Sequence, residues 1–243
     1  MHKSLLSASL FALALAAPLA HAHDAGDIIV RAGAITVNPD ADSSSVKVDQ
    51  GPLAGADLGG KATMSSDTQL GLNFAYMLDS HWGIELLAAS PFEHDVKLKG
   101  TALGAANGKL GSLKHLPPTL SVVYYPLDPK SAFQPYVGAG INYTWIYDEH
   151  VGSEASANGF SNFKAENSWG MAFQVGADYM LTDNVMINAQ VRYIDIDTTA
   201  TVENNAVAPG TRAKVDVDVD PFIYMVGLGY KFGISGMWLV VAI

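Results

Sequence analysis

Large apolar side chains recur at every second position along much of the chain. In residues 69–78, "QLGLNFAYML", leucines and aromatic residues alternate with smaller or polar ones. A period of two is the side-chain period of a β-strand. Stretches of this kind cover residues 27–37, 67–78, 82–97, 113–127, 133–148, 163–181, 184–199 and 213–232. The pattern therefore predicts an all-β fold with eight antiparallel strands.

The segments that join these strands alternate between long and short. Residues 79–81, 128–132 and 182–183 are short connections, whereas residues 38–66, 98–112, 149–162 and 200–212 are long ones. Most of the strands exceed the roughly five or six residues usual in soluble sheets. They reach the roughly 9–11 residues that a tilted strand needs to cross a bilayer. These features predict an eight-stranded transmembrane β-barrel in a Gram-negative outer membrane, with its short turns in the periplasm.

The two faces of the strands differ in polarity. One face carries bulky apolar side chains, among them Phe74, Phe173 and Tyr224. The opposite face carries Arg31, Asn73, Glu85, Ser121, Asn142, Gln174, Asp178, Asn188, Gln190, Arg192 and Lys231. We expect lipid outside the barrel and polar groups within it.

A soluble barrel of the lipocalin type is the alternative, because alternation alone does not separate the two folds. Such a barrel would hold the apolar face inside. Aromatic residues near the turns favour the membrane barrel, since they suit its two interfacial girdles. They are Trp82, Tyr125, Phe133, Tyr136, Tyr179, Tyr230 and Phe232.

The composition restricts the function classes. Charged residues make up 16% of the 243-residue chain, against roughly 25% in typical soluble domains. The net charge of −10 argues against binding to nucleic acid, and the absence of cysteine excludes disulfides and thiolate metal sites. Lys3, an apolar stretch over residues 5–17 and the sequence "AHA" predict a signal peptide over residues 1–22. The barrel then covers residues 23–232.

Several stretches carry a family resemblance that spans residues 1–232. They are "GDIIVRAGAITVNPD", "GIELLAASPFEHDV", "LKHLPPTLSVVYYP", "FQPYVGAGINYT", "NSWGMAFQVGADYML" and "GLGYKF". With these stretches the chain resembles the outer membrane protein W (OmpW) family. The resemblance implies a monomeric barrel with a narrow, hydrophobic channel for small hydrophobic molecules, which leave it sideways into the membrane. It also implies contact with outer-membrane lipid and insertion by the barrel-assembly machinery, and it implies neither an enzyme nor a cofactor.

Three prolines predict an opening in the barrel wall. Pro91 lies within the predicted third strand, and Pro117 and Pro118 lie within the fourth. Proline lacks the N–H that a sheet ladder needs. If the loop between these strands is centred near residue 105, residues 91 and 119 stand opposite each other, and both strands lack donors at one height. We expect a lateral gate there; the alternative is a pair of bulges without function near the barrel rim.

The residues of the interior face predict the contents of the lumen. Side chains nearly fill a barrel of about eight strands, so charges inside it need partners. We expect a plug on the periplasmic side, formed by Arg31, Glu85, Asp178, Arg192 and Lys231. The expected channel lining is Leu87, Ala89, Asn73, Asn142 and Gln174. Packing alone is the alternative role of these lining residues.

Aspartates gather around the last long loop, in "RYIDIDTT" and "KVDVDVDP". The residues that we expect side by side are Asp195, Asp197, Asp216, Asp218 and Asp220. Carboxylates this close repel one another unless a cation lies between them. A divalent cation that bridges to lipopolysaccharide phosphates is one interpretation. A solvated acidic rim is the other, because Pro221 and Gly227 do not match a calcium loop, and no firm metal site is assigned.

The remaining residues point to no catalytic centre. His94 and His115 are candidate neighbours across a hairpin, but no serine–histidine–acid grouping accompanies them. Residues 233–243, "GISGMWLVVAI", form an atypical tail after the aromatic end of the last strand. The expected cargo is a small hydrophobic molecule. Small neutral or polar solutes such as amino acids are the alternative, and a structural or adhesive barrel without transport is a third interpretation.

Overall fold

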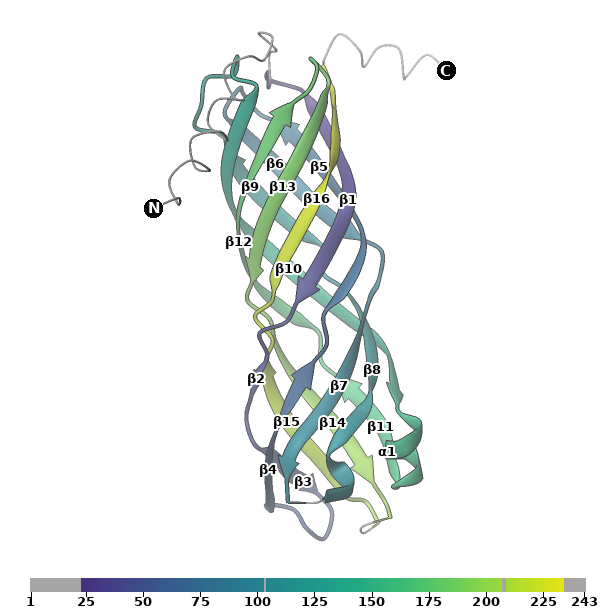
Figure 1. Cartoon of the computed structure of the whole chain (residues 1–243). Coiled ribbons are helices and arrows are strands. Elements are labelled where there is room, and N and C mark those ends of the chain that lie inside the picture. Colours follow the sequence, from purple (N-terminus) through teal and green to yellow (C-terminus); the bar gives the residue numbers. More distant parts are fainter. Residues whose placement is uncertain (1–22, 103, 207–208, 234–243) are drawn as a thin grey trace, which may run out of the picture.

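The computed structural model describes residues 23–102, 104–206 and 209–233. The predicted signal peptide and residues 234–243 of the predicted tail lie outside the described residues. Among the described residues, no helix has the length and apolar character needed to cross a membrane. The strands form one long cylinder, with two sections stacked end to end (Figure 1).

Eight strands form a closed antiparallel barrel, which is the upper section in Figure 1. They are β1 (Ile28–Asn38), β5 (Asp67–Met77), β6 (Trp82–Ala89), β9 (Thr119–Tyr124), β10 (Phe133–Val151), β12 (Ser168–Met180), β13 (Val185–Ile194) and β16 (Phe222–Phe232). Each pairs with its neighbours in chain order, and β1 closes the ring by pairing with both β5 and β16. The predicted eight-stranded transmembrane barrel is confirmed.

The polarity of this barrel is apolar outside and polar inside. Phe74, Phe173 and Tyr224 expose 42%, 52% and 45% of their surface on the exterior. Arg31 and Glu85 are fully buried within. Because successive side chains of a strand point to opposite faces, one strand phase contacts lipid and the other fills the lumen. The membrane interpretation is therefore confirmed over the lipocalin alternative.

The lower section of the cylinder is a second sheet built on the long connections. Its strands are β2 (Asp42–Ser43), β3 (Val46–Gln50), β4 (Asp57–Met64), β7 (Phe92–Thr101), β8 (Gly108–Leu116), β11 (Phe160–Ala165), β14 (Asp197–Asn204) and β15 (Arg212–Asp218). Two short helices, η2 (Gly104–Ala106) and α1 (Ser153–Ala157), lie at its tips. Strand β10 runs through both sections and pairs there with β8. The segments predicted as long connections are therefore largely β-structure, which continues the cylinder outside the membrane.

The interior of this outer section is apolar. Its buried residues include Val46, Leu98, Leu110, Phe163 and Val215, which pack in one cluster with Leu87 and Phe92. The cluster continues into the membrane barrel, to Ile35 and Met225. The cylinder thus has a polar lumen in the membrane section and an apolar interior towards the outside.

The predicted third and fourth strands are both divided at prolines. Strand β6 ends before Pro91 and β7 begins after it, while Pro117 and Pro118 separate β8 from β9. Leu87 pairs with Thr119, and Phe92 pairs with His115. Between these two pairs, residues 88–91 form no pairs with residues 116–118, and we call this gap in the wall the seam. Residue 91 does not stand opposite residue 119 as expected, because the hairpin is centred near residue 103, where Leu98 pairs with Gly108.

Candidate functional site

Four charged side chains form a buried network in the membrane lumen. Arg31 donates hydrogen bonds from Nε to Oδ1 of Asp178 (3.0 Å) and from Nη2 to Oδ2 of Asp178 (2.5 Å). Its Nη1 lies 3.4 Å from Oε2 of Glu85, and Nη2 of Arg192 lies 2.7 Å from Oε1 of Glu85. Two cations thus face two carboxylates, and at most 1% of any of these side chains is exposed. This pairing offsets the cost of removing the charges from water.

Neutral side chains complete the cross-section of this network. Nη1 of Arg31 donates to Oδ1 of Asn73 (3.0 Å), and Nη2 of Arg31 donates to the hydroxyl of Tyr125 (2.8 Å). Gln174 donates from Nε2 to Glu85 (2.9 Å) and accepts at Oε1 from Nε of Arg192 (2.9 Å). The predicted lining residues Asn73 and Gln174 therefore belong to the charged network. Its function as a plug stays a prediction.

Glycines make the room for this network. A Cβ on Gly176 would lie 2.5 Å from Cζ of Tyr136, and one on Gly138 would lie 2.8 Å from Nε2 of Gln174. The Tyr136 ring lies across the lumen with the guanidinium carbon of Arg31 5.5 Å from its centroid. Small residues on the interior face therefore let long side chains from other strands span the lumen.

Two tyrosines point into the lumen, although their positions near turns predict that they belong to the interfacial aromatic girdle. Tyr125 and Tyr136 are at most 1% exposed, and their ring centroids are 5.1 Å apart. The ring of His23 packs 4.4 Å from that of Tyr125, and its Nε2 lies 3.7 Å from Oδ2 of Asp178. Strand alternation carries the signal that was missed, because Tyr125 and Tyr136 share the phase of Val123 and Gln134, which are buried.

Lys231, the fifth predicted plug residue, forms an ion pair outside the predicted set. Its Nζ is 3.8 Å from Oδ2 of Asp27, and its backbone carbonyl accepts a hydrogen bond from Nδ2 of Asn184 (2.8 Å). Asn184 belongs to the short turn before β13, so this contact is at the periplasmic mouth. The structure brings together four of the five predicted plug residues and places Lys231 separately.

The other predicted lining residues lie between the charged network and the outer section. Leu87 is 2% exposed and belongs to the apolar cluster, against which the half-buried Ala89 packs. Nδ2 of Asn142 donates to the carbonyl of Pro118 (3.1 Å) and to Oγ1 of Thr119 (3.0 Å). Asn142 thus ties β10 to the strand that begins after the prolines. A role in transport stays a prediction for all three residues.

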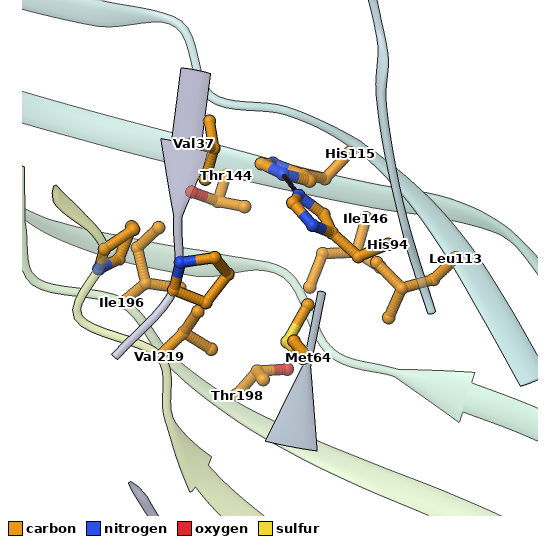
Figure 2. Close-up of a pocket in the computed structure, with 12 residues that line it drawn as sticks. Val37, Met64, His94, Leu113, His115, Thr144, Ile146, Ile196, Thr198 and Val219 are labelled. Carbon is orange, nitrogen blue, oxygen red and sulfur yellow. Dashed lines mark hydrogen bonds between the residues drawn. The ribbon is translucent and has the colours of Figure 1, made fainter. Parts of the chain in front are cut away.

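An apolar cavity lies at the end of the outer section that adjoins the membrane barrel. Figure 2 shows the residues that line it. Its walls come from both sections and include Val37, Met64, Leu113, Ile146, Ile196 and Val219. Its volume is about 30 Å³, and a second cavity of about 20 Å³ lies among the side chains of Val46, Leu98 and Phe163. Cavities of this size hold only a few water molecules, so side chains fill most of the interior of the outer section.

Two histidines on neighbouring strands face this cavity. Nε2 of His94 on β7 lies 2.7 Å from Nε2 of His115 on β8, and Nδ1 of His94 lies 2.5 Å from the carbonyl oxygen of Ser65. The expected contact across the hairpin is confirmed. Burial lowers the pKa of His94 and lowers that of His115 to about 3, where the charge of His94 acts in the same direction. Their joint position in the cavity was not predicted, because the cavity also depends on strands of the second sheet.

The aspartates of the acidic rim divide into two groups. Carboxylate oxygens of Asp195, Asp197 and Asp220 lie within 4.8 Å of one another and could hold a cation. Burial and the neighbouring Asp195 raise the pKa of Asp197. Asp216 instead accepts a hydrogen bond from Oγ1 of Thr199 (2.8 Å), while Asp218 pairs with Asp197 across the hairpin. Cation binding here stays a prediction.

Comparisons with known proteins place this barrel among related ones. The model of the OmpW family matches residues 24–232. Outer membrane protein W of Vibrio cholerae is 41% identical over 232 residues, which cover 96% of this chain and 100% of that protein. The crystal structure of the outer membrane protein OprG from Pseudomonas aeruginosa matches with a TM-score of 0.80 and 49% identity, over 88% of this chain and 99% of OprG.

A more distant relative is also informative. The dibenzothiophene metabolism operon protein PahQ of Pseudomonas aeruginosa is 28% identical over 174 residues, which cover 72% of this chain and 76% of PahQ. The names of the other two relatives and the apolar exterior of the barrel agree on an integral protein of the outer membrane. From the family match, the identities and the shared barrel, the chain belongs to the OmpW family.

Proposed function

We propose that this protein is a channel that passes small hydrophobic molecules across the outer membrane and releases them sideways into it. The fold is of a non-enzymatic class of outer-membrane barrels, so passage is the function to explain. The interruption between β6–β7 and β8–β9 carries the proposal. There the wall lacks ladder pairs between residues 88–91 and 116–118.

The polarity of the lumen favours a sideways route over a straight one. A molecule from outside meets the apolar cluster of the outer section first, which suits hydrophobic cargo. Below it, the network of Arg31, Glu85, Asp178 and Arg192 fills the lumen with paired charges. An apolar molecule gains nothing from entering that network, since it would break hydrogen bonds without replacing them.

The seam lies where the two environments meet. Leu87 is the last paired residue of β6 below the seam and packs in the apolar cluster. Pro91, Pro117 and Pro118 cannot donate ladder hydrogen bonds there, so the two strands are held by fewer bonds than elsewhere. The name of the relative PahQ links it to the metabolism of dibenzothiophene, an apolar aromatic molecule, and this supports the same class of cargo.

Uptake by reconstituted vesicles tests this function. Purified protein is placed in vesicles whose outer leaflet contains lipopolysaccharide, and the entry of an apolar fluorescent probe is compared with that of radiolabelled glycine. Pro91→Ala supplies the missing N–H and should slow the apolar probe only. Pro129→Ala, in the periplasmic turn, is the matched control and should leave both rates unchanged.

The same assay separates the alternatives. Faster entry of glycine than of the probe would favour a channel for small polar solutes. Rates equal to those of protein-free vesicles for both compounds would favour a structural or adhesive barrel. Normal uptake of the probe by Pro91→Ala would reject the lateral gate while leaving the channel in place. Contacts with lipopolysaccharide and with the barrel-assembly machinery stay predictions.

A further inference from the structure

The hydrogen bonds of His94 fix where its ring proton lies. Nδ1 of His94 is 2.5 Å from the carbonyl oxygen of Ser65, which can only accept a hydrogen bond. Nδ1 therefore carries the hydrogen. Since the neutral imidazole holds one ring hydrogen, Nε2 of His94 is an acceptor.

This assignment determines the state of His115. The two Nε2 atoms are 2.7 Å apart, so one hydrogen must lie between them, and it belongs to His115. The remaining ring nitrogen of His115, Nδ1, is then a bare acceptor. It has no hydrogen-bond partner among the described residues, although His115 is only 5% exposed. A buried acceptor without a partner is costly, so its donor comes from outside the protein, as a water molecule or as a hydroxyl group of a ligand that displaces the water.

The cavity walls supply no such donor. Among the described residues that line the cavity, only Thr144 and Thr198 carry a side-chain hydroxyl. Thr144 donates its hydrogen to Oδ1 of Asn142 (2.7 Å), and Thr198 donates to the carbonyl of Glu166 (2.7 Å). Both hydroxyl hydrogens are therefore engaged. The rest of the lining is apolar, as Figure 2 shows.

We propose that His115 is the recognition point for the hydroxyl group of an otherwise apolar small molecule, an alcohol or a phenol. The hydroxyl donates to Nδ1 of His115, and the apolar body lies against the walls of the cavity. This inference rests on the proposed function for the entry of the molecule and adds a cargo class to it. Apolar pockets with a few placed polar groups orient ligands in this way.

The site lies on the proposed route. His115 pairs with Phe92, and this is the first ladder pair above the interrupted seam. The cavity, with a volume of about 30 Å³, is too small for the whole molecule, so its walls must move apart to admit the apolar body. A molecule held at His115 is therefore positioned beside the seam while it passes the narrowest apolar section.

Phenol and toluene make a matched pair of probes, since a hydroxyl in one replaces a methyl group in the other. The ¹⁵N NMR signal of Nδ1 of His115 is recorded in lipid nanodiscs at pH 8, where both rings are neutral. We expect the signal of a non-protonated nitrogen, which shifts with phenol and stays in place with toluene. In vesicle uptake, the ratio of phenol to toluene rates should exceed that of protein-free vesicles by roughly tenfold, the effect of one buried hydrogen bond.

Three variants complete the test. His115→Phe keeps an aromatic ring beside Phe92 but loses the acceptor, and the ratio should fall to that of protein-free vesicles. His115→Gln supplies an amide oxygen and should keep part of the preference. His150→Phe, on the exposed end of β10, should leave the ratio unchanged. If His115→Phe does not fold into a heat-resistant barrel, the NMR titration of the wild-type protein decides.

The outcomes separate this inference from the proposed function. A protonated Nδ1 in the free protein, or no shift with phenol, overturns the inference. Equal ratios for wild type and folded His115→Phe also overturn it, even when Pro91→Ala slows the apolar probe as the channel proposal expects. A phenol-induced shift without any apolar uptake would uphold the site and reject the channel.

Discussion

Each charged side chain in the membrane lumen depends on a partner from another strand. Asp178 on β12 accepts two hydrogen bonds from Arg31 on β1, and neither side chain is exposed. Asp178→Asn leaves the cation of Arg31 short of its main partner, and breaking a buried pair in this way costs about 3–5 kcal/mol. We expect the free energy of unfolding to fall by that amount, measured by urea titration in lipid vesicles with tryptophan fluorescence.

An exposed ion pair is the control for this substitution. Lys109 lies 2.7 Å from Asp95, and 46% and 39% of these two side chains are exposed. Lys109→Gln should change the free energy of unfolding by no more than about 1 kcal/mol. Equal effects of the two substitutions would mean that burial does not strengthen the dependence of Arg31 on Asp178.

The histidine pair gives the outer section a dependence on pH. The pKa of His115 is about 3 in the folded protein, against 6.5 for the free side chain, and that of His94 is lowered too despite the opposing charge of Asp67. Between these values the unfolded chain binds more protons, so stability rises with pH. The contribution is complete above about pH 6.5 and is lost as the pH falls towards 3.

Limited proteolysis of β7 and β8 between pH 7 and pH 4.5 measures this effect. We expect faster cleavage at the lower pH, and His115→Phe should remove most of the change. Carboxylates with lowered pKa values, such as Asp49 and Asp148, do not interfere, because they titrate below their ordinary value of 3.8. If wild type and His115→Phe show the same pH profile, the pH dependence of cleavage does not come from the histidine pair.

The alternation of side chains made the buried network predictable residue by residue. Arg31, Glu85, Asp178 and Arg192 share the interior phase of regular strands, so the pattern alone assigns them to one lumen. Lys231 shares that phase, but its height along β16 places it at the mouth with Asp27. Phase fixes the side of a strand on which a residue lies, whereas height depends on the tilt and register of the whole barrel.

At the scale of elements, the seam is a place where two strands stop exchanging hydrogen bonds. Leu87 pairs with Thr119, and this is the last pair of β6 with β9. The next pair of the same kind would join Ala89 to Pro117, but Pro117 has no N–H for the carbonyl of Ala89. The ladder therefore stops, and the amide of Ala89 also lacks a partner across the seam. We expect the amide hydrogen of Ala89 to exchange about tenfold faster than that of Leu87, since one lost hydrogen bond of about 1 kcal/mol changes local opening by this order. NMR in deuterated lipid nanodiscs measures both rates.

The variant Pro117→Ala tests the cause of this difference. It gives the carbonyl of Ala89 a donor, so the ladder can extend by one pair and the amide of Ala89 can donate to the carbonyl of residue 117. The two exchange rates should then converge. The amide of Leu87 serves as the internal reference, because its own pairing is unchanged. A protected Ala89 amide in the wild-type protein would contradict an unzipped seam.

The eight membrane crossings were predictable from long stretches of period two, but the outer sheet was not. Its strands are short or interrupted: β2 spans two residues, and the register of β3 shifts against both β4 and β15. Such bulges break the alternation that identifies a strand. The sequence predicted His94 and His115 as candidate neighbours across the hairpin. Their cavity could not be predicted in the same way, because Val37 and Ile146 of other strands also line it.

At the scale of the whole molecule, the charged network and the apolar outer section divide the cylinder into two environments. Glu85 joins Arg31 to Arg192, and Gln174 bonds to both Glu85 and Arg192. These contacts fill the lumen where an aqueous path to the periplasm would run. Ions should therefore cross a planar bilayer containing the wild-type protein only slowly, in contrast to larger barrels with open channels.

Removing one ion pair from this network should open the aqueous path. The double variant Glu85→Ala, Arg192→Ala takes away one carboxylate and one cation, so the lumen stays neutral while it loses two long side chains. We expect a clear rise in single-channel conductance over the wild type, and little change for Lys61→Ala with Asp42→Ala, an ion pair exposed on the outer section. If the inner double variant folds and its conductance equals that of the wild type, the network does not close the lumen.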